Sequence, residues 1–177
     1  MNIVNSLVDI NGLKISQTKS DGLDCDFCSG NIEQVFLNDI GGDGLDFSGS
    51  NIDGKVKMAS NVKDKVISIG EESKVKFEVE NVKNSYLVAA IKDGSSSKIK
   101  LSNIETNGNI IMSYVKKDFY NKRTKAEVSF SQEKETLDLK RFITTEDADL
   151  FVNKIKINPS VLDIKALYDS GPMRKEK

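Results

Sequence analysis

The stretch Asp39-Ile-Gly-Gly-Asp-Gly-Leu-Asp-Phe-Ser-Gly-Ser50 indicates the fold, because a weaker copy of it lies one repeat upstream. That copy reads Ser20-Asp-Gly-Leu-Asp-Cys-Asp-Phe-Cys-Ser29. Short apolar segments that recur at such a period, separated by glycine and polar corners, are typical of a parallel β-helix. In that fold each repeat makes one turn and buries its apolar face only by stacking on the next turn. The sequence therefore predicts an all-β coil of about 22 residues per turn.

Composition excludes several classes of protein. The chain has 177 residues, enough for one domain with a real core, and its 26 basic and 27 acidic residues give a net charge of −1. Such a balance provides no net positive electrostatic field that would attract nucleic acid, and we expect no nucleic-acid partner. No apolar run approaches the roughly 20 residues that cross a bilayer, so we expect no membrane insertion. Residues 1–7 lack the pattern of a signal peptide, and the chain itself indicates no compartment.

Apolar residues recur in columns when the chain is stepped by one period. A column that starts two residues before another lies on the same face of the same strand. We expect all these side chains to point into the coil, with at least two strands per turn. The columns are Ile15, Leu37, Met58, Val79 and Leu101; Leu13, Val35, Val56, Phe77 and Ile99; Ile40, Val62, Val82 and Ile104; Leu23, Leu45, Ile67 and Leu87; and Cys25, Phe47, Ile69 and Ala89.

A polar column lies directly before one of the apolar ones, at Asp39, Asn61, Asn81 and Asn103. Asn and Asp tolerate the left-handed backbone conformation and bond readily to nearby backbone groups. Stacked side-chain amides can also bond from one turn to the next. We therefore predict a structural ladder at one corner of the coil.

The repeats run from about Ile10 to about Phe130, which corresponds to five or six turns. We assign residues 1–130 to the β-helix and residues 131–177 to a C-terminal cap packed on the last turn. The cap is expected to contain a solvated connector over 131–135, a strand over 137–143, a tight hairpin over Asn153-Lys154 and a helix over Val161–Tyr168.

The start of the chain shows no comparable cap. An open turn offers unpaired backbone groups and apolar side chains to another chain. Three alternatives follow: the first nine residues cover the turn, the chain self-associates through its N-terminal turn, or it is the C-terminal part of a larger protein.

The repeats resemble the pectin-lyase-like superfamily of right-handed parallel β-helices over residues 1–130. More specifically, they look like the C-terminal β-helix module of large bacterial surface proteins with spore-coat-kinase-like or lamin-tail-like domains. This resemblance implies a right-handed coil, a short tail ending in a helix, and a non-catalytic module associated with carbohydrate at the cell surface or outside the cell. The segments that carry it are Ser20–Asp24, Ile40–Ser50, Asp64–Ser73 and Ala90–Ser95.

Four aspartates form the strongest candidate for chemistry. Asp21 and Asp43 share one position of the repeat, and Asp24 and Asp46 share another, so each pair should stand on adjacent turns about 4.8 Å apart. Carboxylates that close can act as general acids or attract a cation such as Ca²⁺. The simpler interpretation, which we favour, is that they form turn hydrogen bonds; no cofactor is required.

One alternative function follows from the same superfamily. Lys19-Ser-Asp-Gly-Leu-Asp24 is similar to the Asn-Thr-Asp-Gly-Ile-Asp segment in which polygalacturonases carry catalytic aspartates. Their next turn supplies Gly-His-Gly, whereas this chain has Asp64-Lys-Val66 there and no histidine at all. The resemblance therefore implies at most a degenerate glycoside hydrolase.

Lysines recur on the expected outer face at Lys55, Lys76 and Lys98. Stacked on consecutive turns, they could bind an acidic polysaccharide, with Phe36 as an exposed aromatic for a sugar ring. The alternative is a solvated face whose lysines prevent unwanted strand pairing. A third possible role for the whole protein is a structural stalk.

Cys25 and Cys28 have CxxC spacing, but one such pair without histidine cannot complete a four-ligand zinc site. Strand alternation places Cys25 inside and Cys28 on the opposite face. We therefore expect two reduced cysteines.

Overall fold

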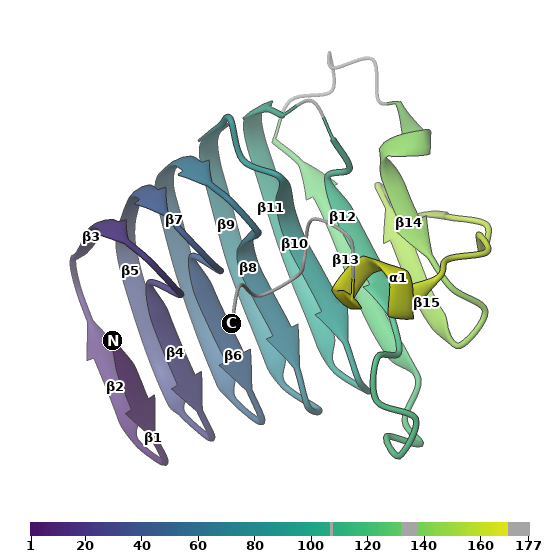
Figure 1. The fold of residues 1–177 in the computed structure, drawn as a ribbon, viewed down its shortest axis with the longest axis horizontal. Coiled ribbons are helices and arrows are strands. Elements are labelled where there is room, and N and C mark those ends of the chain that lie inside the picture. The colour runs from purple at the N-terminus through teal and green to yellow at the C-terminus, as the bar shows by residue number, and fades with distance from the viewer. Residues whose placement is uncertain (107, 132–137, 170–177) are drawn as a thin grey trace.

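The computed structural model describes residues 1–106, 108–131 and 138–169. It confirms a parallel β-solenoid, with about seven turns of about 22 residues (Figure 1). One sheet, here called sheet A, has seven parallel strands in the order β1 (Asn2–Val4), β4 (Leu23–Asp26), β6 (Leu45–Ser48), β8 (Lys65–Gly70), β10 (Leu87–Lys92), β12 (Ile111–Tyr114) and β14 (Phe142–Thr144).

The second sheet, sheet B, contains the longer strands. Its parallel strands are β2 (Leu7–Ile10), β3 (Leu13–Thr18), β5 (Ser29–Ile40), β7 (Asn51–Val62), β9 (Lys74–Lys83), β11 (Ser96–Glu105), β13 (Thr124–Phe130) and β15 (Ala148–Val152), and antiparallel β16 (Ile155–Lys156) pairs with β15.

The predicted polar ladder is found as two separate pairs and not as one column. Asp39, Asn61, Asn81 and Asn103 all have left-handed backbones, with φ between 50° and 55°. The Asn61 side chain donates to Asp39 Oδ1 at 2.7 Å, and Asn103 donates to Asn81 Oδ1 at 3.1 Å. Asn81 instead donates to the carbonyl of Lys57, so the ladder is interrupted between Asn61 and Asn81.

The interruption reflects a turn that is longer than the average period. Val56 pairs with Val79, whereas the expected columns paired Val56 with Phe77 and Met58 with Val79. Between β5 and β7 the expected column is wrong by one residue, because Leu37 pairs with Ala59 and not with Met58, after an irregularity of the pairing at Val35. An offset of one residue moves a side chain to the other face of the sheet. Met58 is accordingly not in the core: it is 44% exposed, and Ala59 takes the inward place beside Leu37.

In sheet A the pairing is regular and the expected columns were two residues short, because each residue of β8 pairs with the one 22 positions later. Ile67 therefore pairs with Ala89, and Ile69 pairs with Ile91. Leu87, expected beside Ile67, pairs with Lys65 instead. The remaining apolar positions of the columns behave as predicted, because nearly all of them are buried or pack against one continuous core.

The coil extends beyond the detectable repeat at both ends, and beyond the predicted boundary at its C-terminal end. β1 and β2 form a turn before Ile10, and β14 and β15 continue both sheets after residue 130, pairing in parallel with β12 and β13. The count of five to six turns and the boundary at residue 130 were therefore wrong.

Other parts of the expected cap are found in altered form. The hairpin is confirmed, with Asn153 and Lys154 at φ 47° and 69° between β15 and β16. Residues 139–141 form a 3₁₀ turn, and the strand is limited to β14. Leu137 and most of the connector, residues 132–135, lie outside the described residues.

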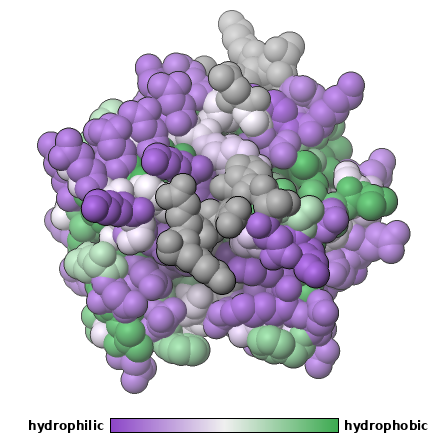
Figure 2. Space-filling model, viewed as in Figure 1, coloured by the Kyte–Doolittle hydropathy of each residue, from purple (hydrophilic) through white to green (hydrophobic). Residues whose placement is uncertain are grey.

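Helix α1 (Ile164–Asp169) covers the side of the coil rather than its last turn. Its apolar residues and Leu162 pack against Ala90, Met112 and Tyr114 on the outer face of sheet A, and Tyr114 Oη lies 2.5 Å from Tyr168 Oη. Around this region, Figure 2 shows a surface that is mostly hydrophilic, with hydrophobic residues mainly toward its margins. Among the described residues, helices are too short and polar to cross a bilayer.

The expectation for the cysteines was wrong. Cys25 and Cys28 are both buried and are joined by a disulfide, with their Cα atoms 5.9 Å apart. Phe27 between them adopts φ 56°, and this left-handed corner reverses the strand alternation so that both sulfurs point inward.

Candidate functional site

A groove of about 1230 Å³ runs across the strands on the outer face of sheet B. It extends from β5 to β15, so it follows the axis of the coil. The buried Phe77, Ile99 and Val128 lie behind its floor, and most of its other lining residues are charged. Six are basic and four acidic: Lys55, Lys76, Lys98, Lys100, Lys125 and Lys154, and Glu33, Asp53, Glu78 and Glu127.

The three lysines predicted to form one column do line this groove, but they do not form a single column. Lys76 and Lys98 are neighbours in register on β9 and β11. Lys55 is paired in register with Glu78 instead, because the turn from β7 to β9 is longer than the average period. The charges therefore alternate along part of the groove, which sequence stepping at a fixed period did not predict.

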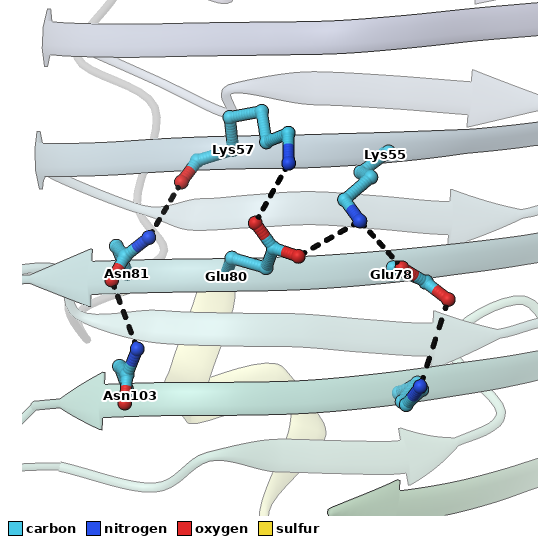
Figure 3. A network of polar contacts seen from close by, with 7 residues as sticks. Lys55, Lys57, Glu78, Glu80, Asn81 and Asn103 are labelled. Carbon is cyan, nitrogen blue, oxygen red and sulfur yellow. Dashed lines mark hydrogen bonds and ion pairs between the residues drawn. The ribbon is translucent and has the colours of Figure 1, made fainter. Parts of the chain in front are cut away.

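Lys55 is neutralised by glutamates on the adjacent strand. Its Nζ lies 2.7 Å from Glu78 Oε2 and 2.8 Å from Glu80 Oε1, and Lys57 Nζ reaches Glu80 at 3.2 Å (Figure 3). Hydrogen bonds to Glu78 and Glu80 raise the pKa of Lys55, and the bond from Lys55 lowers the pKa of both glutamates. This network stabilises the outer face and leaves Lys55 little capacity for an external anion.

The centre of the groove is different. Lys76 and Lys98 are like charges on strands about 4.8 Å apart. Lys98 is 71% exposed and has one partner, Glu127 at 3.5 Å, while Lys76 takes part in none of the ion pairs found within residues 1–106, 108–131 and 138–169. Asp53 lies beside Lys76 in register without an ion pair to it. Two such lysines repel each other, and an anion placed between them would relieve that repulsion.

An aromatic ring lies at the β15 end of the groove. Phe151 lines the groove, and the Nζ atoms of Lys125 and Lys156 each lie 5.9 Å from its ring centroid. An amphipathic ring surface with nearby cations suits a sugar that carries a carboxylate. Sequence reasoning missed Phe151 because the repeat is not detectable after residue 130.

Phe36, the aromatic that was predicted to bind sugar, lies elsewhere. It is exposed on the outer face of β5, opposite Met58 of β7, and it does not line the groove.

The four aspartates are brought together in the predicted pairs. Asp24 is opposite Asp46 on β4 and β6, and Asp21 Oδ1 accepts a hydrogen bond from the backbone N–H of Asp43 at 2.8 Å. In turn, Asp43 Oδ1 accepts a bond from the backbone N–H of Lys65 at 3.2 Å. The chain of bonds along Asp21, Asp43 and Lys65 supports the interpretation as corner hydrogen bonds.

Lys65 is the residue that sequence reasoning missed here. Its Nζ lies 2.9 Å from Asp43 Oδ1 and 2.5 Å from Asp64 Oδ2, and its side chain is only 2% exposed. Burial is the largest influence on the pKa values of both Asp43 and Lys65. It raises the pKa of Asp43, although the Lys65 ammonium lies beside this carboxylate. For Lys65, burial opposes the charged form, but the two aspartates outweigh it and raise the pKa. Asp43 and Lys65 are both buried, so a polymer has no direct access to their charged groups.

Within the part of the chain that the structure describes, no three His, Cys, Asp or Glu residues are grouped so as to hold a metal ion. The described residues therefore include no such ligand group for the Ca²⁺ ion that the four aspartates suggested.

Comparison of the chain with protein-family models, curated proteins and solved structures finds no match.

Proposed function

We propose that the chain is a non-catalytic module that binds an acidic polysaccharide along the groove of sheet B. The observation that carries this proposal is the Lys76–Lys98 pair at the groove centre, whose charge the neighbouring carboxylates do not fully neutralise. The lysines that line the groove outnumber the acids by six to four, which favours an anionic ligand over a cationic one.

The shape of the groove supports an extended polymer. The groove crosses successive strands at about 4.8 Å per turn, so a linear chain lying along it meets the same kind of position repeatedly. Phe151 at one end provides a ring on which a sugar can stack. A role at the cell surface is also part of this proposal, and it is supported only by the resemblance of the repeat motifs.

Binding of oligogalacturonate, measured by isothermal titration at low salt, tests the proposal. Affinity should fall as salt is added, because the contact is electrostatic. The double variant Lys76→Gln, Lys98→Gln should bind about 2- to 30-fold more weakly, given roughly 0.2–1 kcal/mol for each of two exposed ion pairs. As a matched control, Lys14→Gln with Lys165→Gln removes two exposed lysines outside the groove and should change affinity less than about twofold.

Three results would contradict the proposal. Equal binding of a neutral oligosaccharide would remove the role of the lysines, and equal losses in both double variants would show only a non-specific charge effect. No binding to any polysaccharide would favour the structural stalk.

The hydrolase alternative has its own readout. Release of new reducing ends from pectate, abolished by Asp21→Asn with Asp43→Asn, would indicate a polygalacturonase-like enzyme. We expect release at background level, since Asp43 is buried against Lys65.

A further inference from the structure

The N-terminal end of the solenoid is an unpaired edge. β1 pairs only with β4, while β2 and β3 pair only with β5, so one side of each of these three strands has no strand partner within the described residues. A strand edge of this kind exposes backbone N–H and C=O groups that can pair with another chain.

The side chains at this end are apolar as well. Leu7 is 84% exposed, and Met1 and Val4 are more than half exposed. Behind them, residues that belong to the core are only partly covered. These are Ile3, Ile10, Leu13 and Ile15, all of which pack against the main core cluster.

The opposite end of sheet B is closed. β16 folds back antiparallel on β15, and the following Ile157 is buried. β16 pairs with Phe151 and Val152, and the backbone N–H of Ile157 donates to the Leu150 carbonyl, so three of the five residues of β15 have a partner on this edge. A second molecule therefore cannot continue this sheet head to tail by pairing its β2 along the whole of β15. Growth into an open fibre is therefore blocked on this sheet.

We propose that two copies of this chain associate end to end through β1, β2 and β3, related by a two-fold axis. Another copy presents three strand edges in the same arrangement, which is what a self-complementary interface requires. The strands of this end contain one acidic residue, Asp9, and one basic residue, Lys14, so two identical ends carry no net charge that would repel them.

The number of residues in β1, β2 and β3 limits the affinity of the proposed dimer. The three strands comprise 3, 4 and 6 residues, together 13, against roughly 20–30 residues per partner in a stable interface of standard size. The dimer should therefore be weak and depend on concentration. It does not depend on the proposed polysaccharide, because the groove lies on the side of the coil.

Sedimentation velocity over a series from low to high micromolar concentration tests this proposal. The expected result is a reversible monomer–dimer equilibrium that stops at two. In the variant Val4→Lys, Leu7→Lys, dimerisation should weaken about tenfold or more, since two apolar contacts are replaced by like charges across the two-fold axis. Both positions are exposed in the monomer, so the far-UV circular dichroism should be unchanged.

The control variant Val161→Lys makes the same change at an exposed position after the last strand, and it should dimerise like the wild type. A strictly monomeric mass at high micromolar concentration would overturn the proposal. So would oligomers that grow beyond the dimer, or a Val4→Lys, Leu7→Lys variant that dimerises as tightly as the wild type.

Discussion

Replacing Leu37 and Met58 by alanine, one at a time, tests the register of the coil at the point where the repeat is irregular. Leu37 is fully buried, and it packs so closely that one of its methyl carbons lies 2.6 Å from where a Cβ on Gly44 would be. The stacked turns around it allow little collapse, so we expect Leu37→Ala to lower the free energy of unfolding by about 3–5 kcal/mol. Met58 is 44% exposed, and Met58→Ala should cost less than about 1 kcal/mol.

Urea unfolding followed by circular dichroism gives both values, provided that the transition remains cooperative and the slope with denaturant is unchanged. Stepping by a fixed period would place both residues in the core and predict similar losses. Equal destabilisation by the two variants would therefore refute the register described here, as would a loss under about 1 kcal/mol for Leu37→Ala.

Two further predictions concern polar residues. Lys65→Met leaves two buried carboxylates without their cation and should cost about 3–5 kcal/mol at pH 7. The loss should be smaller at acidic pH, because burial raises the pKa of Asp43 and that carboxylate then takes up a proton. The raised pKa of Lys65 stabilises the fold below the ordinary lysine value of about 10.4, and this contribution disappears as the pH rises through the folded-state pKa. In thermal melts, the alkaline loss of stability should therefore be smaller for Lys65→Met than for the wild type, with the remainder coming from other lysines of raised pKa such as Lys55. Asn61→Ala should lower the free energy of unfolding in urea by about 1–2 kcal/mol, because alanine tolerates φ 55° poorly and loses the hydrogen bond to Asp39. Asn61→Gly should cost less, because glycine adopts this φ without strain. Equal losses in the two variants would mean that the backbone conformation at this position is unimportant.

The architecture could be predicted because its determinants are local and repeated. Glycine and Asp or Asn corners such as Asp39 and Asn61 mark the turns, and apolar positions two residues apart mark the inward face. The position of Met58 could not be predicted, since an irregularity of the β5–β7 pairing at Val35 places Ala59 beside Leu37, and only the pairing itself reveals the shift. The ends were also missed, because β1 and β14 are strands of three residues that carry too few side chains to show a period.

The candidate site was predictable only in part. Sequence stepping placed Lys76 beside Lys98, since no irregularity lies between β9 and β11. It could not show that Lys55 is neutralised by Glu78, or that Lys65 is buried between two aspartates, because both depend on three-dimensional pairing. Phe151 reaches the groove through a strand that lies outside the detectable repeat.

Mapping the bound polysaccharide on the protein is the most direct test of the proposed function. In a titration of ¹⁵N-labelled protein with oligogalacturonate, we expect the largest amide shifts in β9, β11 and β13 around Lys76 and Lys98, and they should weaken as salt is added. Shifts confined to the outer face of sheet A near Asp24 and Asp46, or to Phe36, would contradict the proposed groove, and no shifts at millimolar ligand would contradict polysaccharide binding itself.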